Sequence, residues 1–216
     1  MAVAKFSSNQ LKILDMIYNF GCVEKEQLRL VFEKPASDGE DKGLADISEE
    51  KKASFFDLTI KMFEKTHRIS VVDGKYLLPP GDSVTPANMD MCSCFWVMLK
   101  ICKNPGDIKN AFRLPQKPSV CYVAADMQHP VELFYCDHDD TLAFNKIREK
   151  MEMYDFQTKD SGLDTKIKCI LVTRNAEMPK YLKNYKFADD LIIAIIGANG
   201  PDGKPEITLK KKPCDK

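Results

Sequence analysis

The sequence has few of the features that mark secreted, membrane or nucleic-acid-coating proteins. Among its 216 residues there are three histidines and one tryptophan. Its 32 Lys and Arg residues balance its 32 Asp and Glu residues, so the formal net charge at pH 7 is zero. A neutral chain does not coat DNA or a membrane by overall charge, so any contact with a polyanion must come from a local basic patch.

Long apolar runs are also missing. No run approaches the roughly 18 apolar residues that mark a membrane span, and the longest, Leu191 to Ala198, has the length of a strand. The first residues lead into a polar helix start and lack the apolar core of a signal peptide. We therefore expect a cytoplasmic protein with no membrane partner. Its eight cysteines lie mostly within apolar patterns, which favours buried, reduced thiols over disulfides or zinc ligands.

The chain does contain enough apolar residues for a packed core. Apolar residues make up 44% of the sequence and aromatic residues 9%, a composition that excludes a disordered chain. The length allows one large domain or two small ones. The proline-rich stretch from Pro79 to Pro86 predicts a short, stiff linker. We therefore assign residues 1–80 to a first domain, 81–90 to the linker and 91–216 to a second domain.

Three helices are expected in the first domain. Ser7 and Gln10 have the spacing of a capping box, Phe6 and Leu11 stand at the positions of a hydrophobic staple, and Gly21 marks the end of the helix. This helix is expected to bury one face, formed by Leu11, Leu14 and Ile17 with Tyr18. A second helix is predicted over residues 23–33, with an apolar stripe of Leu28, Val31 and Phe32, and a polar loop over 35–43.

The third helix begins after the N-cap candidate Ser48, and its pattern separates two faces. Its apolar side is expected to hold Phe55, Phe56, Leu58, Ile60, Met62 and Phe63. Its polar side is expected to hold Lys51, Ser54, Asp57, Lys61, Lys65 and Arg68. The pair Asp73-Gly74 then lies between runs of β-branched and aromatic residues, which is the strongest short-range signal for a β-hairpin.

Three helices followed by a hairpin resemble a winged helix-turn-helix domain, and the resemblance covers residues 6–80. It implies that the third helix enters the major groove of double-stranded DNA and that the hairpin, or wing, touches the backbone or the minor groove. On this mapping the DNA-binding residues are Lys51, Lys52, Ser54, Lys61, Lys65 and Arg68, with Lys75 at the tip of the wing. Residues 51–75 hold six Lys or Arg against three Asp or Glu, which supplies a local basic patch.

Two features leave alternatives to DNA binding open. The loop between the second and third helices is much longer than the usual turn of three or four residues. Winged helices also serve as protein–protein interaction modules, and a lysine-bearing helix face is often only solvated surface. The first domain is therefore expected to bind DNA, with protein binding as the alternative.

The second domain has an α/β pattern. Thr85 and Pro86 suit the N-cap and first position of a largely buried helix. The predicted elements after it are strands over 119–125 and 131–136, a helix capped by Asp140, a strand over 167–172, a short helix over 178–185, a strand over 191–196 and an edge strand near 207–209 before a frayed lysine-rich tail. Strand, helix and strand in succession predict a right-handed parallel crossover. The fold class is thus an α+β winged helix followed by an α/β domain with a mixed, partly parallel sheet.

Motifs that carry chemistry are sparse in this domain. No phosphate loop and no Gly-x-Ser-x-Gly elbow are present. The segment Cys136-Asp137-His138-Asp139-Asp140 gathers several metal-capable side chains, but a polar strand-to-helix junction with an N-cap explains it as well, and we favour that interpretation. Structural zinc sites usually combine two ligand pairs, and the chain has no such set. We therefore expect no metal and no cofactor.

The whole arrangement resembles the replication-relaxation-type proteins of plasmids and conjugative elements, whose second domain is similar to the PD-(D/E)xK nuclease fold. The resemblance implies carboxylates at Asp126 and Glu132, with Asp137 as a third candidate, that would bind Mg²⁺ or Mn²⁺. Phe134 stands where that family has a lysine, and Lys146 or Lys150 could take the vacant role. We expect a non-catalytic domain for dimerisation or partner binding, in a regulator of transcription or replication, with an active nuclease as the alternative.

Overall fold

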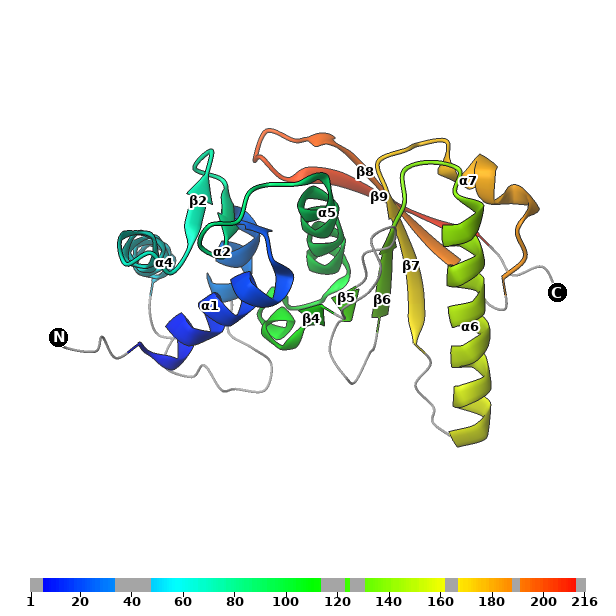
Figure 1. Ribbon diagram of the computed structural model, residues 1–216, viewed down its shortest axis with the longest axis horizontal. Helices are drawn as coiled ribbons and strands as arrows, with labels where there is room; N and C mark the ends of the chain where they lie inside the picture. The colour runs from blue at the N-terminus through cyan, green and yellow to red at the C-terminus, as the bar shows by residue number, and fades with distance from the viewer. Residues whose placement is uncertain are drawn as a thin grey trace. The chain divides into compact units, whose positions relative to one another are not determined.

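Figure 1 shows the computed structural model, which describes residues 6–33, 48–113, 123–124, 131–161, 167–187 and 191–212. The structure is α+β, with a mixed, partly parallel sheet in its C-terminal part. The chain divides into two compact units. The first holds Met1–Cys92 and Ile101–Phe112, and the second holds Ser93–Lys100 and Arg113–Lys216. Within the ranges described, no helix is both long and apolar enough to cross a membrane.

The first helix, α1 (Ser8–Phe20), begins and ends as the sequence predicts. The Ser7 hydroxyl accepts a hydrogen bond from the Gln10 amide (3.3 Å), and the Gln10 side-chain carbonyl accepts one from the Ser7 amide (2.9 Å), which completes the capping box. Gly21 ends the helix at φ 72°, and its amide donates to the Ile17 carbonyl. A left-handed φ of this kind suits glycine because it has no Cβ.

The buried face of α1 differs from the predicted one. The residues in the core are Ile13, Met16, Ile17 and Phe20, at the spacing i, i+3, i+4 and i+7. Leu11 and Tyr18 are exposed. Phe6, at the first position of the predicted staple, packs edge-to-face on Phe63, with the ring centroids 5.4 Å apart.

The second helix, α2 (Lys25–Glu33), starts two residues later than expected. Val23 and Glu24 instead form a short strand, β1 (Val23–Glu24). Gln27 explains the shorter helix, because its side-chain oxygen accepts a hydrogen bond from the Glu24 amide (2.9 Å) and its nitrogen donates to the Cys92 carbonyl (2.7 Å). The predicted apolar stripe of α2 is confirmed as buried: Leu28, Val31 and Phe32.

The third helix of the first unit, α4 (Glu49–Lys65), begins where predicted. Ser48 occupies its N-cap position, but the Ser48 side chain makes no capping hydrogen bond. The predicted loop over residues 35–43 lies outside the described residues.

The hairpin is formed by β2 (Ser70–Val72) and β3 (Tyr76–Leu78). Asp73 and Gly74 at its turn both have positive φ, 52° and 64°, and the Lys75 amide donates to the Val72 carbonyl (3.0 Å). Val72 pairs with Tyr76, so the loop has three residues, and the hairpin that the Asp-Gly pair predicts is confirmed. Strand β1 pairs antiparallel with β3, so the small sheet has the order β1-β3-β2.

The helix α5 (Pro86–Ile101) begins inside the predicted linker, and its residues are divided between the two units. Its start is capped by Thr85 and Asn88, whose side chains each accept a hydrogen bond from the other's amide (3.2 and 3.0 Å). Eight consecutive residues, 91–98, are buried, as the apolar pattern of this helix predicts. A short 3₁₀ helix, η1 (Pro105–Asn110), follows it and was not expected from the sequence.

The second unit is built on a six-stranded sheet in the order β4-β5-β6-β7-β8-β9. The strands are β4 (Phe112–Arg113), β5 (Val123–Ala124), β6 (Val131–Tyr135), β7 (Lys168–Thr173), β8 (Leu191–Asn199) and β9 (Pro205–Lys212). The strands β6, β7 and β8 are parallel, while β5 and β9 are antiparallel to their neighbours. The predicted parallel crossover and the predicted edge strand are therefore confirmed.

One face of this sheet is covered by α6 (Thr141–Ser161), which lies alongside β6 and β7 in Figure 1. Its predicted core face is confirmed, because Phe144, Ile147, Met151 and Tyr154 pack in one cluster with residues of β6, β7 and β8. The short helices α7 (Met178–Tyr181) and η2 (Leu182–Asn184) add Met178 and Leu182 to the same cluster.

Two further predictions about the second unit are wrong. Three strands rather than two precede α6, because the two-residue strand β4 is too short to leave a pattern in the sequence. The lysine-rich segment after Leu209 was expected to be frayed, but as far as Lys212 it is part of β9. Its residues pair with β8: Lys210 with Ile193, Lys211 with Ile192 and Lys212 with Leu191. The predicted strand over 119–125 is described only at Val123–Ala124.

Six of the eight cysteines lie in the described residues, and all six are free: Cys22, Cys92, Cys94, Cys102, Cys136 and Cys169. Five of these six are buried. The prediction of reduced thiols is confirmed for this set, while Cys121 and Cys214 lie outside the described residues.

Candidate nucleic-acid interface

The outward face of α4 carries a row of basic and polar side chains. Lys51, Ser54, Lys61 and Lys65 are exposed and follow one another at spacings of three, seven and four, which places them along one side of a helix. The side opposite to this row packs in the core through Phe56, Thr59, Ile60 and Phe63. Four of the predicted DNA-binding residues therefore share one solvent-exposed face.

The other two predicted residues of this segment are not part of that row. Lys52 is half-buried. Arg68 is exposed just beyond the end of α4, where its amide donates to the Phe63 carbonyl (2.8 Å) and its carbonyl accepts from the Tyr18 hydroxyl (3.0 Å). These two backbone bonds fix the position of Arg68 next to the last turn of α4, while its side chain is exposed to solvent.

The apolar side chains of α4 are not all in the core, which corrects the predicted face. Phe55 is 45% exposed and Leu58 is 63% exposed, and both lie beside the basic row with the half-buried Met62. Apolar residues surround most of this helix, but the first unit covers only the side that carries Phe56. The interface candidate thus combines lysines with an apolar strip.

Lys75 does not project from the wing as expected. Its ammonium group lies 3.2 Å from the carboxylate of Glu24, on β1, and 5.0 Å from the centre of the Tyr76 ring. Burial lowers the pKa of Lys75, but Glu24 and Tyr76 together outweigh this effect and hold the pKa above its ordinary value. The positive charge of Lys75 is therefore compensated within the small sheet, and the turn itself presents Asp73 and Gly74.

An ion-pair network links α4 to α2 through Asp57, which lies on the polar side of α4. The Asp57 carboxylate lies 2.8 Å from the Lys25 ammonium and 3.4 Å from the Arg29 guanidinium, both on α2. Arg29 also pairs with Glu26 (3.3 Å). These contacts hold α2 against α4 and pair the two cations of α2, Lys25 and Arg29, with carboxylates.

Of the carboxylates expected for a nuclease, the two that the structure describes, Glu132 and Asp137, do not converge. Glu132 on β6 is 2% exposed, and Asp137 follows the end of the same strand. At about 3.3 Å per residue, the five residue steps from Glu132 to Asp137 correspond to roughly 16 Å, too far for two ligands of one ion. The third candidate, Asp126, lies outside the described residues. Phe134, at the position of the family's lysine, is buried.

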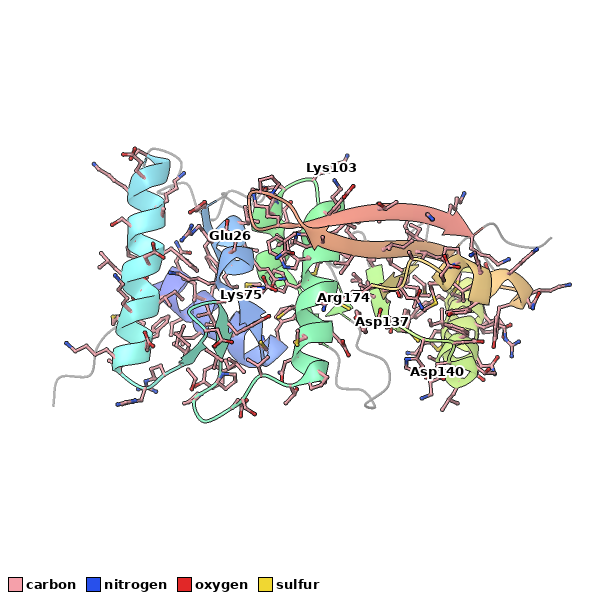
Figure 2. All side chains as sticks on the ribbon, turned by 90° about the horizontal axis from the view of Figure 1, so that it is seen from above. Glu26, Lys75, Lys103, Asp137, Asp140 and Arg174 are labelled. Carbon is pink, nitrogen blue, oxygen red and sulfur yellow. The ribbon has the colours of Figure 1, made fainter. Side chains whose placement is uncertain are left out.

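Each of the two described acids has structural partners. Asp137 accepts hydrogen bonds from the hydroxyls of Tyr135 and Thr173 and from the Arg174 amide, and it lies near Arg174 in Figure 2. Arg174 in turn donates to the Ser93 hydroxyl (2.9 Å). Asp137 therefore joins the end of β6 to the end of β7.

Glu132 has a different environment. It accepts a hydrogen bond from the Tyr154 hydroxyl, and its Oε1 lies 3.9 Å from the Lys150 ammonium. Among the described residues, that Oε1 atom has no hydrogen-bond partner. Burial raises the pKa of Glu132, and the opposing effects of Tyr154 and Lys150 do not cancel it. The structure thus brings Lys150, one of the two lysines that the sequence offered for the vacant role, next to Glu132.

The buried carboxylate of Glu132 gives a testable pH dependence. Because its pKa in the folded chain lies above its ordinary value of 4.5, ionisation above that pH costs more in the folded than in the unfolded state. Glu132→Gln removes this cost and retains an oxygen for the Tyr154 hydroxyl. We expect the stability of Glu132→Gln relative to the parent to rise from about pH 4 to about pH 7 in urea unfolding.

The matched control for this measurement is Glu152→Gln on the exposed side of α6, where Glu152 lies 4.0 Å from Arg148. That substitution should not increase in relative stability over the same pH range, because its carboxylate is hydrated. Parallel stability curves for the parent and Glu132→Gln would contradict the raised pKa.

A scan against protein-family models, a search of curated proteins and a search of solved structures each found no match to this chain.

Proposed function

We propose that the first unit is a winged helix-turn-helix domain that binds double-stranded DNA through the outward face of α4. The order α1, β1, α2, α4, β2, β3 and the sheet order β1-β3-β2 support this fold. Strand β1, which the sequence did not predict, adds to the resemblance because it completes a three-stranded sheet with the hairpin.

The observation that carries the DNA-binding proposal is the row formed by Lys51, Ser54, Lys61 and Lys65. The major groove of B-DNA is wide enough to admit an α-helix, and lysine and serine side chains contact phosphate oxygens on either side of it. Phe55 and Leu58 lie beside the row, where apolar side chains can contact thymine methyl groups. Lysines therefore account for affinity in this proposal, and the apolar strip accounts for base preference.

We assign the second unit a non-catalytic role in dimerisation or partner binding, in a regulator of transcription or replication. This part of the proposal is supported by the burial of Glu132 and by the three hydrogen bonds that Asp137 accepts. The resemblance to replication-relaxation-type proteins supports a setting on a mobile element.

The salt dependence of DNA binding tests the proposal. If Lys51, Lys61, Lys65 and Arg68 each neutralise one phosphate, the logarithm of the association constant should fall with the logarithm of salt concentration with a slope of about −3.6. The measurement is fluorescence anisotropy of a labelled duplex of mixed sequence, titrated with the full chain. The absence of binding at about 50 mM salt would contradict DNA binding, because electrostatic contacts are strongest there.

A second candidate function is protein binding by the same face, and the exposure of Phe55 and Leu58 favours it. Large apolar side chains gathered on a surface often mark protein interfaces. The two functions differ in the effect of Leu58→Ala on the anisotropy titration. In the DNA proposal this variant binds duplex DNA with the salt slope of the parent, because no charge has changed.

A further inference from the structure

We propose that Cys136, His138 and Asp140 bind one divalent transition-metal ion, and that Zn²⁺ is the ion their chemistry fits best. The three residues lie in the segment that leaves β6 and enters α6. This segment is at the carboxyl ends of the parallel strands β6 and β7. In open α/β sheets, ligands usually bind outside the carboxyl ends of the strands. Neither the DNA-binding proposal nor the nuclease alternative uses these three side chains as a set.

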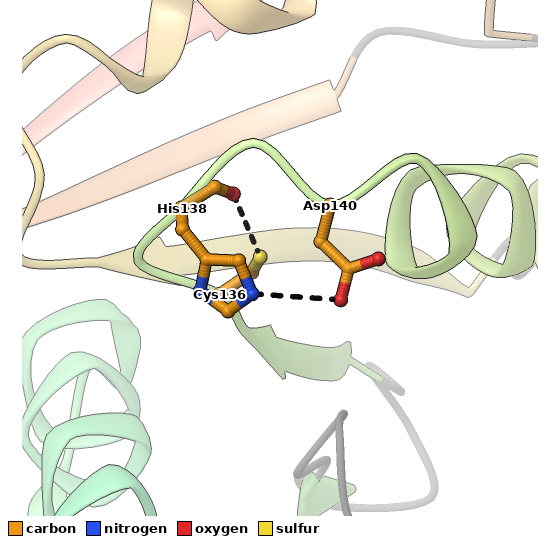
Figure 3. Close-up of side chains that lie close together, drawn as sticks. All are labelled: Cys136, His138 and Asp140. Atoms are coloured by element: carbon orange, nitrogen blue, oxygen red, sulfur yellow. Dashed lines mark hydrogen bonds and ion pairs between the residues drawn. The ribbon is translucent and has the colours of Figure 1, made fainter.

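The spacing of the three side chains suits a metal ion. One ligand atom from each residue, the Cys136 sulfur, a His138 ring nitrogen and an Asp140 oxygen, lies within 4.8 Å of the other two. Figure 3 shows them converging, with His138 Nε2 at 3.7 Å from Asp140 Oδ2. Tetrahedral ligands with bonds of about 2.2 Å are roughly 3.6 Å apart, so side-chain rotations of about 1 Å complete the site.

The backbone that carries these ligands is held in place on both sides. The Cys136 amide donates to the Val172 carbonyl (3.0 Å), and the Asn175 side chain donates to the Asp137 carbonyl (2.9 Å). The Asp137 carboxylate accepts from Thr173 (3.0 Å). A ligand loop fixed in this way loses little conformational freedom when an ion binds.

Asp140 can serve two roles because its two oxygens face different partners. Its Oδ1 accepts hydrogen bonds from the Leu142 and Ala143 amides (both 3.0 Å), which confirms the predicted cap of α6. Its Oδ2 faces His138. The junction favoured by the sequence is therefore present, and it leaves one carboxylate oxygen directed toward the other two ligands.

The donor set selects the class of ion. A thiolate, an imidazole and a carboxylate are the ligands of Zn²⁺ and related transition metals, whereas Mg²⁺ and Ca²⁺ prefer oxygen ligands alone. In the metal-free chain the Cys136 thiol donates to the His138 carbonyl (3.2 Å), and its proton passes to solvent when the sulfur binds the ion. The side chain of His138 is 76% exposed, so a fourth position at the ion can be filled by water.

The test is a Co²⁺ titration of the reduced full chain, with Co²⁺ as a spectroscopic substitute for Zn²⁺. We expect a near-ultraviolet thiolate-to-cobalt charge-transfer band that saturates at one ion per chain and disappears when Zn²⁺ is added. The main variant is His138→Ala, because it changes an exposed side chain and leaves the cap and the core intact. It should weaken Co²⁺ binding by more than about tenfold.

Two controls separate this site from other thiols and from surface charge. Asp140→Asn retains an N-cap oxygen and should weaken binding, whereas Asp139→Asn removes the same charge from a neighbouring residue and should leave binding within about twofold of the parent. His67→Asn removes a histidine of the first unit and should have no effect. A parent chain without the charge-transfer band, or one whose band His138→Ala leaves unchanged, would overturn the proposal.

Discussion

We expect the double variant Lys61→Ala, Lys65→Ala to bind duplex DNA roughly 60-fold more weakly than the parent at about 0.1 M salt. A lysine–phosphate contact releases close to one counterion, which at that salt concentration favours binding by about eightfold per contact. The two lysines lie one helical turn apart on the exposed face of α4, so both contacts are lost together. The slope of log affinity against log salt should fall in magnitude by about 1.8.

The control for this experiment must remove the same charge from another part of the chain. Lys183→Ala, Lys186→Ala does so, because both lysines are exposed in the second unit and their loss leaves α4 unchanged. This control should bind DNA with the affinity and salt slope of the parent. Equal losses in the two double variants would show that DNA responds only to net charge, and that α4 is not the interface.

Features decided by neighbouring residues were predicted well from the sequence. The capping box of Ser7 and Gln10, the hairpin turn at Asp73-Gly74 and the cap at Asp140 each depend on residues within three positions of one another. The pattern of β6, α6, β7 and β8 was also predictable, because an amphipathic helix between apolar strands has few alternative arrangements.

Features decided by distant residues were not predictable. Strand β1 has two residues and exists because Val23 and Glu24 pair with Leu77 and Tyr76, more than fifty positions away. The same pairing brings Glu24 within 3.2 Å of Lys75, so the charge of one predicted DNA-binding residue is compensated. No local pattern near Val23 signals a partner at that distance, and the helix propensity of the following residues favours an earlier helix start.

The candidate sites show the same division. The sequence placed Lys51, Ser54, Lys61 and Lys65 on one face, because helical spacing alone decides it. It did not show that Glu132 and Asp137 have different environments, because two of the three hydrogen bonds that Asp137 accepts come from Thr173 and Arg174, more than thirty residues later. The sequence also could not show whether the segment Cys136–Asp140 has the geometry of a metal site, because that geometry depends on contacts with Asn175 and Val172.

The largest change in stability is expected from a residue on the side of α4 that packs in the core. Phe55 and Phe56 are neighbours of identical chemistry, yet Phe56 is 2% exposed and Phe55 is 45% exposed. Removing a buried phenyl ring leaves a cavity and costs about 3–5 kcal/mol. We expect Phe56→Ala to lower the free energy of unfolding by that amount, and therefore to lower the urea midpoint by more than about 1 M.

Phe55→Ala is the matched variant, and we expect it to change stability by less than about 1 kcal/mol. The ring already contacts water over nearly half its surface, and alanine has a higher helix propensity, which offsets part of the lost packing. Both variants would be unfolded in urea and followed by far-ultraviolet circular dichroism. A cost for Phe55→Ala as large as that for Phe56→Ala would mean that the apolar strip is buried. Since Phe55 and Leu58 lie beside Lys51 and Lys65, that result would also remove the exposed face on which the DNA-binding proposal rests.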